Sequence, residues 1–521
     1  MRLLRSTAII ASLTLVSRVL GLVRDVMIAR FLGAGAVSDA FFIAFKLPNV
    51  FRRMFAEGAF NAAFIPLYAK RIEQDGESSA DKFASEAASA LFFTVALLVI
   101  GFQITMPVSL NIIGFGLDRA VNADGISPYY LAVFYALITM PYLLFMSMTA
   151  LFSGVLNTRN KFALAAGVPI LLNLFMISAL VLTPRLGLDQ RGIGLALAIA
   201  ITASGAAQAA TVLWGARRAG MTLHLRRPRL TPGVKRLIVL GVPGIIGSGI
   251  TQINLLVSTT IASMQSSAVS WLTYADRLYQ LPLGMIGIAM GVALLPSLSR
   301  SLRSGDEVAA MSTQNRAIEL SMLFTLPAAA ALFIVPDILI AGLFQRGEFT
   351  SETTVQVAKA LQYFALGLPA FVLLKVLTPA FFAREDTRTP MVWAGVSAVI
   401  NISLGYALFV SIGFEGLALA TSIAAWANVA GLAVLLTRSR HLVTDRRLRQ
   451  RLPRILLSAL IMGAALYLFR GYMPDLGAAS FAVDIIALAV LTGGGGLVFG
   501  LAAASLRAYG LADIKEAFKR K

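Results

Sequence analysis

Charged and amide side chains recur between residues 18 and 57, in a stretch that is otherwise almost wholly apolar. A charge at the centre of a membrane-spanning helix costs roughly 2.5–3.5 kcal/mol on insertion scales, so charges at this depth usually serve a function. Arginine offers a planar fork of donors that matches a phosphate group and stays charged. Cations in this setting predict a site for an anion. The polar residues concerned are Arg18, Arg24, Asp25, Asp39, Lys46, Asn49, Arg52, Arg53 and Glu57.

The later polar residues of this stretch recur at helical spacing. Intervals of 7, 3, 4, 4 and 4 residues place them on one face of a helix. Such a face is expected to look into a bundle interior or a water-filled cavity. Snorkelling at the membrane surface is the alternative, which suits Arg18 alone better than a stripe several turns long. Pro48 is expected to kink or break the helix. The stripe comprises Asp39, Lys46, Asn49, Arg53, Glu57 and Asn61.

Composition indicates an integral membrane protein. Of 521 residues, 58% are hydrophobic and 14% charged, and the mean hydropathy is +0.78. No cysteine is present, and the two histidines, His224 and His441, lie in arginine-rich loops. Thiolate chemistry, histidine-based catalysis and metal clusters therefore lack ligands, and the chain is not expected to be an enzyme or to hold a metal or cofactor. The first apolar run shows no cleavage site and is expected to serve as the first transmembrane helix.

Fourteen apolar segments have the length of a membrane span, which predicts an all-α polytopic protein with fourteen transmembrane helices. Both termini then lie on one side. With the N-terminus inside, 31 basic residues fall in cytoplasmic segments and 7 in opposite loops, so both termini are expected in the cytoplasm. The segments are 6–29, 36–68, 84–114, 128–156, 162–183, 191–215, 234–262, 268–299, 316–343, 357–382, 390–411, 415–437, 453–471 and 480–506.

The basic residues that remain lie inside the membrane. They number seven, including Arg277 and Lys375, against four clear acids, including Asp276, which leaves a surplus of about three positive charges. A cavity with this surplus attracts anions. The net charge of +19 is thus explained by topology and by contact with anionic lipids, not by nucleic acid. The arginine-dense stretch 438–454 is expected to anchor on anionic headgroups, with a regulatory docking site as the alternative.

Short motifs repeat at a nearly constant offset. Ala36-Val-Ser38 recurs as Ala268-Val-Ser270, Leu47-Pro48 as Leu281-Pro282, and Ile65-Pro-Leu67 as Leu295-Pro-Ser297, at offsets of 232, 234 and 230. Asn157-Thr-Arg159 with Asn173 matches Asp386-Thr-Arg388 with Asn401. Each unit holds six helices, so the repeats are parallel, as in many transporters. The predicted domains are a six-helix lobe at 1–220, a second at 221–440, and two further helices with a tail at 441–521.

The motifs resemble those of the MurJ/MviN family of lipid II flippases, within the multidrug/oligosaccharidyl-lipid/polysaccharide exporter superfamily. The resemblance spans essentially the whole chain. It is carried by Ser38-Asp39-Ala-Phe41, Lys46-Leu-Pro-Asn49-Val-Phe-Arg52-Arg53, Glu57-Gly-Ala-Phe60, Leu156-Asn-Thr-Arg-Asn-Lys161-Phe and Tyr274-Ala-Asp276-Arg277-Leu.

This resemblance implies a V-shaped pair of lobes that flips lipid II, a polyprenyl-pyrophosphate disaccharide-pentapeptide, across the bacterial inner membrane by alternating access. It implies functional charges at Arg18, Arg24, Asp39, Arg52, Arg53, Glu57 and Arg277. It also implies a groove for the polyprenyl tail at the last two helices. Some members bind sodium through acids in helices 7 and 11, but segments 234–262 and 390–411 contain no Asp or Glu. The coupling ion stays open, and the membrane potential is one candidate.

Three expectations about the structure follow. Helices 1–6 should superpose on helices 7–12, an apolar groove should lie beside Gly493–Gly496 and open into the central cavity, and Arg24, Arg52 and Arg277 should converge on one cavity. A flippase for another polyprenyl-pyrophosphate sugar uses the same phosphate chemistry, and only the motifs favour lipid II. A drug or cation antiporter would need an acidic surplus. A membrane scaffold for cell-wall enzymes would need matched charge pairs. The expected partners are lipid II, anionic lipids and cell-wall synthesis proteins, with the chain working as a monomer.

Overall fold

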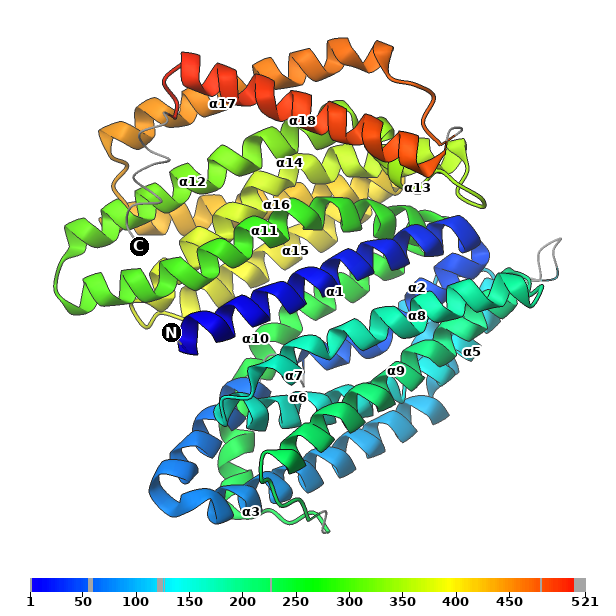
Figure 1. Cartoon of the computed structure of the whole chain (residues 1–521), viewed down its shortest axis with the longest axis vertical. Helices are drawn as coiled ribbons and strands as arrows, with labels where there is room; N and C mark the ends of the chain where they lie inside the picture. The colour runs from blue at the N-terminus through cyan, green and yellow to red at the C-terminus, as the bar shows by residue number, and fades with distance from the viewer. Residues whose placement is uncertain are drawn as a thin grey trace. The chain divides into compact units, whose positions relative to one another are not determined.

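The computed structural model of the chain describes residues 2–54, 60–119, 125, 127–224, 227–477 and 480–509, which fold almost wholly as α-helices (Figure 1). Hydrocarbon offers no water to backbone groups, so a membrane chain must satisfy its N–H and C=O groups within helices. The first ten helices are α1 (Arg2–Leu32), α2 (Ala36–Arg52), α3 (Asn61–Ile104), α4 (Met106–Ile113), α5 (Pro128–Thr139), α6 (Tyr142–Thr158), α7 (Phe162–Gly167), α8 (Pro169–Arg185), α9 (Gln190–Arg218) and α10 (Pro232–Ala262). They are followed by α11 (Ala268–Arg303), α12 (Glu307–Ile334), α13 (Pro336–Phe344), α14 (Ser351–Phe382), α15 (Arg388–Ile412), α16 (Glu415–Arg438), α17 (Arg446–Phe469), a 3₁₀ turn η2 (Arg470–Tyr472) and α18 (Phe481–Ser505).

The described residues of the fourteen apolar segments lie almost wholly in these helices, and several segments are broken within the span. Segment 128–156 consists of α5 and α6, segment 162–183 of α7 and α8, and segment 316–343 of α12 and α13. By length and composition, 10 helices of the described chain qualify as membrane spans. The other four segments lie in α1, in α2 with the start of α3, in α10 and in α11.

One glycine divides the long helix α3. Gly76 has φ 80° and ψ 170°, a left-handed backbone that favours glycine, and the chain turns there between two helical parts. The turn lies between the expected spans 36–68 and 84–114. Several other helices begin at a side chain that accepts a hydrogen bond from the first turn, among them α9 at Asp189, α12 at Asp306 and α17 at Asp445.

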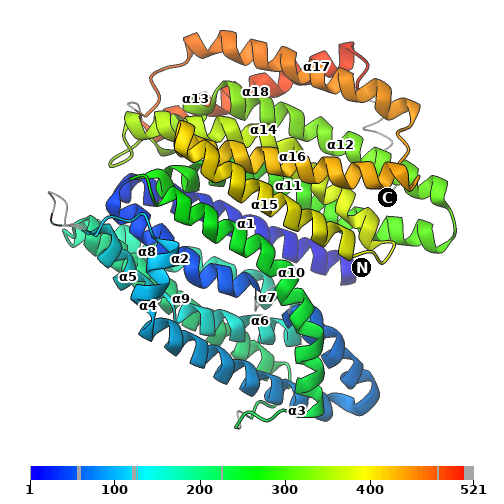
Figure 2. The same ribbon diagram turned by 180° about the vertical axis from the view of Figure 1, so that it is seen from behind.

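The helices form two compact units, Met1–Ser270 and Trp271–Lys521. In the first unit, α10 packs on α2, α3 and α4 (Figure 2), although the sequence repeat assigns this helix to the second lobe. The compact units therefore do not follow the repeat boundaries. The division at residues 220 and 440 stays a prediction.

In the second unit, α14 packs on α12 and α16, and α15 packs on α16. The last two long helices, α17 and α18, run side by side in both views (Figures 1 and 2). Helix α17 also packs on α12, and α18 packs on α13. The C-terminal pair is thus attached to the unit through α12 and α13.

Candidate substrate-binding site

Arg24 is buried in α1 and held at all three of its nitrogens. Its Nε and Nη2 donate to Asp25 Oδ1 at 3.0 and 2.7 Å, and its Nη1 donates to Asn173 Oδ1 at 2.9 Å. Asn173, on α8, in turn donates through Nδ2 to the carbonyl of Ser17 at 2.9 Å. Both Arg24 and Asp25 are 8% exposed. A buried charge in this position needs such partners, because an uncompensated one is strongly destabilising.

Asp39 is buried in the first turn of α2 and binds the start of α11. Its carboxylate accepts hydrogen bonds from the N–H groups of Ser267 and Ser270, each at 2.8 Å, and from the Ser270 hydroxyl. Helix N-termini leave N–H groups without an intrahelical partner, and a carboxylate there is favoured by the helix dipole. Asp39 therefore caps α11 from outside that helix. All of these residues belong to the first unit.

The middle of the polar stripe contacts neutral oxygens. Lys46 Nζ donates to Thr259 Oγ1 of α10 at 2.8 Å. Arg52 Nε donates to Asn49 Oδ1 at 3.1 Å, and Asn49 Nδ2 donates to the carbonyl of Phe45 at 3.0 Å. Lys46, Asn49 and Arg52 are each half-buried. The stripe thus stays partly accessible along α2.

Pro48 does not end α2, which stays helical to Arg52. Proline lacks the N–H that would bond the carbonyl four residues earlier, here that of Ala44. The hydroxyl of Thr139, on α5, donates to this carbonyl at 3.1 Å, and Thr139 is fully buried. A neighbouring helix therefore satisfies the backbone group that Pro48 leaves free, as membrane helices require.

The remaining predicted residues are spread over both units. Arg18 and Arg53 are exposed, on α1 and directly after α2. Asp276 and Arg277 are half-buried on α11, in the second unit, and Asp276 accepts a hydrogen bond from Gln280. Glu57 lies outside the described residues. Because Arg277 belongs to a different unit from Arg24 and Arg52, the convergence of these three arginines stays a prediction.

Sequence reasoning did not assign Asn173, Thr259 or Ser270 to the site. Asn173 carried a usable signal, since it is an amide inside an apolar segment and recurs as Asn401 in the repeat. Thr259 and Ser270 carried none as ligands, because threonine and serine are common in membrane helices and usually bond their own backbone. Among the described residues, no group of three His, Cys, Asp or Glu side chains could hold a metal ion.

A family model for lipid II flippase MurJ matches residues 28–488. A probable lipid II flippase MurJ of Rhizobium meliloti (strain 1021) is 46% identical over 467 residues, which cover 90% of this chain and 86% of that protein. This chain belongs to the lipid II flippase MurJ family. A MurJ of Burkholderia cenocepacia, also named a lipid II flippase, is 36% identical over 436 residues, 82% of each chain. MurJ proteins are transporters and not enzymes, so the expected absence of a catalytic role agrees with the family.

The fold agrees with that of a solved MurJ. A structure of a lipid II flippase MurJ in an inward closed conformation matches with a TM-score of 0.77 and 25% identity, covering 95% of this chain and 98% of that one. An inward-facing multidrug transporter of the MATE family matches in fold, with a TM-score of 0.69 and 15% identity over 83% of this chain. The expected all-α, multi-pass membrane transporter fold is thus confirmed.

Beside the last helix of this MurJ family member lies an apolar cavity of about 230 Å³. Helices α12 and α13 supply one wall, including Ala331 and Leu339, and α17 supplies Leu466. Gly495 and Gly496 of α18 line the cavity as well, and a Cβ atom added at Gly496 would meet nothing within 4 Å. The cavity lies where the sequence predicts a groove. Its opening into a central cavity stays a prediction.

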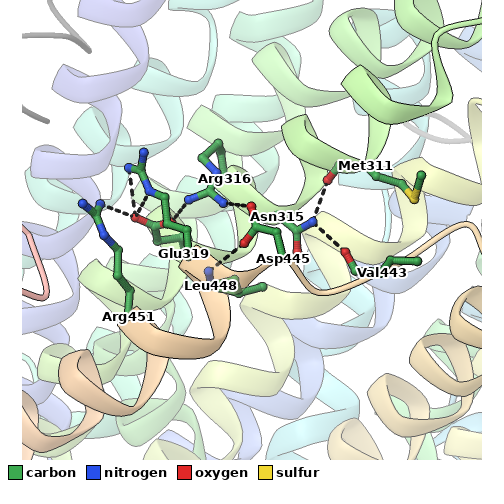
Figure 3. A network of polar contacts seen from close by, with 9 residues as sticks. Met311, Asn315, Arg316, Glu319, Val443, Asp445, Leu448 and Arg451 are labelled. Atoms are coloured by element: carbon green, nitrogen blue, oxygen red, sulfur yellow. Dashed lines mark hydrogen bonds and ion pairs between the residues drawn. The ribbon is translucent and has the colours of Figure 1, made fainter.

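Ion pairs hold both ends of the helices that line this groove. At one end Glu319 of α12, 2% exposed at its side chain, pairs with Arg316, with Arg447 at 3.3 Å and with Arg451 at 2.7 Å (Figure 3). At the other end Arg346 pairs with the buried Asp484 of α18. Arg470 also pairs with Asp337 at 2.5 Å. Part of the arginine-dense stretch 438–454 therefore binds α12, a use that the sequence did not predict.

Asp445 extends this network at the start of α17. Its carboxylate accepts the N–H of Leu448 at 2.7 Å and pairs with Arg316 (Figure 3). Partial burial alone would raise the pKa of Asp445, but the hydrogen bonds from Leu448 and Arg316 outweigh it and lower this pKa below its ordinary value. The carboxylate thus caps α17 and links it to α12.

Proposed function

We propose that this chain flips lipid II from the cytoplasmic to the periplasmic leaflet of the bacterial inner membrane by alternating access. The observation that carries the proposal is the cluster of cations at membrane depth in α1 and α2, within a chain that matches lipid II flippase MurJ over residues 28–488. Proteins keep charges at this depth for function. Lipid II supplies a pyrophosphate that such a cluster would bind.

The substrate site uses arginine forks for the pyrophosphate. Arg24, Arg52 and Arg277 are its proposed anion ligands, and Arg18, Lys46 and Arg53 raise the local potential. Bidentate hydrogen bonds to phosphate offset the loss of hydration on entry into the membrane. Asp25 and Asn173 orient Arg24, as their hydrogen bonds to all of its nitrogens support. Asn49 positions Arg52 in the same way. Asp39, Glu57 and Asp276 act on the conformation around the cations.

The polyprenyl tail occupies the apolar cavity between α12, α13, α17 and α18. Burial of each methylene group of an isoprenoid chain there is worth about 0.8 kcal/mol relative to water, while lipid competes on nearly equal terms. The groove therefore positions the tail more than it supplies affinity. Gly495 and Gly496 have no side chains, so the polyprenyl tail can lie close to the backbone of α18.

The orientation of the protein in the membrane follows the distribution of its basic residues, which puts both termini in the cytoplasm. The protein works as a monomer alongside cell-wall synthesis proteins and anionic lipids. A flippase for another polyprenyl-pyrophosphate oligosaccharide is the second candidate, since the phosphate chemistry is the same. A non-transporting scaffold is the candidate of a different class.

Flipping of fluorescent lipid II by the purified protein in liposomes tests the proposal. The fraction of label that an impermeant quencher reaches should rise faster with protein than in empty liposomes. A polyprenyl-linked O-antigen unit, tested in parallel, should flip more slowly. Equal rates in protein-containing and empty liposomes would favour the scaffold, and faster flipping of the O-antigen unit would favour the second candidate.

A further inference from the structure

A second cavity, of about 300 Å³, lies in the first unit and apart from the charged stretch of α1 and α2. It is formed where α6 and α9 end and α7 begins. The residues that define it are Leu156, Lys161, Leu164, Trp214, Gly215 and Arg218. None of them belongs to the proposed lipid II site.

The two helix ends that frame this cavity have the same backbone motif. Asn160 follows α6 with φ 59°, and the N–H of Lys161 returns to the carbonyl of Leu156 at 2.8 Å. Gly220 follows α9 with φ 89°, and the N–H of Met221 returns to the carbonyl of Ala216 at 3.0 Å. This Schellman geometry reverses the chain within one turn. It fixes the backbone of Lys161 against the last turn of α6.

The cavity is expected at the level of the membrane surface. Its two framing helices are candidate spans, Pro128–Thr158 with α5 and Gln190–Arg218, and the cavity lies at the last turn of each. Trp214 is 51% exposed, and tryptophan is enriched where hydrocarbon meets headgroups. Leu156 and Leu164 add an apolar wall. Gly215 permits this wall, because a Cβ there would lie 2.5 Å from Leu164 Cδ1.

Two cations face the cavity without a counter-charge. Lys161 and Arg218 are exposed, and neither forms an ion pair with any described residue. The Arg218 guanidinium lies 4.3 Å from the centre of the Trp214 ring, which restrains it. Carbonyl groups at helix C-termini oppose an anion. Here those of Leu156 and Ala216 accept N–H groups, and that of Ala219 accepts Arg159 at 2.6 Å.

We propose that this cavity binds the headgroup of an anionic phospholipid. Lys161 and Arg218 hold the phosphate, and the acyl chains lie along Trp214 and Leu164. A soluble phosphate would use the two cations but would leave the tryptophan and the leucines without a role. The charge, the ring and the apolar wall together match a lipid that is anionic and amphipathic.

Native mass spectrometry of the full-length protein tests the proposal with phosphatidylglycerol and phosphatidylcholine as probes. Wild-type protein should bind one phosphatidylglycerol more tightly than phosphatidylcholine. The K161Q/R218Q double variant should weaken this binding roughly 30-fold, about fivefold for each cation. R217Q is the matched control, because Arg217 lies in the same helical turn but does not line the cavity. Unchanged affinity in the double variant, or equal loss in R217Q, would overturn the proposal.

Two further measurements use the unaltered chain. Phosphatidylglycerol with a photoreactive acyl chain should cross-link to peptides that contain residues 156–164 and 214–219, and cross-links confined to other regions would refute the site. Glycerol phosphate, the headgroup without acyl chains, should compete poorly. If glycerol phosphate competed as strongly as the whole lipid, the ligand of this cavity would be a soluble phosphate and not a lipid.

Discussion

The Ser270 hydroxyl lies 3.0 Å from the hydroxyl of Ser38, and the two serines occupy the same position in the sequence repeat, 232 residues apart. Each is the third residue of its helix, since α2 begins at Ala36 and α11 at Ala268. The first turns of the two repeat-related helices therefore meet. Asp39, the next residue, closes this contact by binding the N–H groups of Ser267 and Ser270.

Replacing Asp39 tests this cap. Asp39→Ala leaves the buried N–H of Ser270 and the half-buried N–H of Ser267 without this acceptor, which should lower the free energy of unfolding by about 1–3 kcal/mol. Asp39→Asn keeps one acceptor oxygen and should cost less. Thermal unfolding of the purified protein, followed by intrinsic fluorescence, measures both. Ser38→Ala, which removes the hydroxyl contacts with Ser270 and with the backbone of Gly35 but leaves the Asp39 carboxylate in place, is measured alongside. An Asp39→Ala protein that melts with the wild type would contradict the cap.

Substitutions of Arg24 distinguish a role in anion binding from a purely structural ion pair with Asp25. Arg24→Ala should reduce lipid II flipping in liposomes to the rate without protein, and Arg24→Lys should restore part of it, since lysine keeps the charge but loses the fork. The double variant R24Q/D25N removes both members of the pair and should stay folded and inactive. Recovery of flipping in that double variant would mean that Arg24 serves only to neutralise Asp25.

Thr139 and Pro48 should be energetically coupled. Thr139→Val removes the hydroxyl that bonds the Ala44 carbonyl and should cost about 1–3 kcal/mol of stability, the penalty for a buried unsatisfied acceptor. Pro48→Ala supplies an N–H to the same carbonyl within α2, so Thr139→Val should cost much less in that background. A double-mutant cycle on thermal stability gives the coupling energy. Additive effects would show that the two residues act independently.

Two glycines of α18 offer a matched test of the predicted groove. Gly496 lines the apolar cavity, whereas Gly494, on the same helix, does not, and a Cβ atom added at either would meet nothing within 4 Å. Gly496→Phe should fill the groove and slow flipping, while Gly494→Phe should leave the rate near that of wild type. Both variants are compared in the liposome assay. Equal rates for the two variants would remove the groove from the transport path.

Acid should weaken the attachment of α17. The folded-state pKa of Asp445 is lowered, so its carboxylate adds stability above the ordinary pKa of about 4 and loses this contribution as the pH falls through the lowered value. Stability between neutral pH and about pH 5 should change little from this residue. Asp445→Asn should reduce stability at neutral pH and flatten the acid side of the profile. Thermal unfolding from neutral pH to below about pH 4 checks the sign, and a wild-type-like acid profile in the variant would contradict it.

Patterns in the sequence predicted the elements well and their partners poorly. Hydropathy placed the spans, and the repeated Ala-Val-Ser marks the first turn of both α2 and α11. By contrast, basic-residue counting assigns Arg159 to a cytoplasmic loop, whereas it is bound to the buried Asp81 at 2.6 Å and to Tyr68 at 3.1 Å. Seventy-eight residues separate Arg159 from Asp81, and only helix packing decides that they meet.

Short sequence matches between the two repeats do not always mark equivalent positions in the structure. Asn157-Thr-Arg159 closes α6, but its counterpart Asp386-Thr-Arg388 precedes and begins α15. Glu319 lies inside an expected span, yet it was not among the acids counted at membrane depth. Two of its arginine partners, Arg447 and Arg451, come from the stretch 438–454 that the sequence assigned to lipid. A charge pair between distant helices leaves no periodic trace in either one, which is why pattern analysis missed it.

The Glu319 cluster has a consequence for biogenesis. During synthesis, α12 leaves the ribosome with Glu319 and its neighbour Arg316, while Arg447 and Arg451 lie 128 and 132 residues farther along the chain. At roughly 5–20 residues per second, that interval lasts from about six seconds to nearly half a minute. During this interval the Glu319 carboxylate has Arg316 as its only arginine partner from this cluster, at the membrane surface or in the insertion machinery. The final packing of α12 thus depends on α17, which is synthesised later.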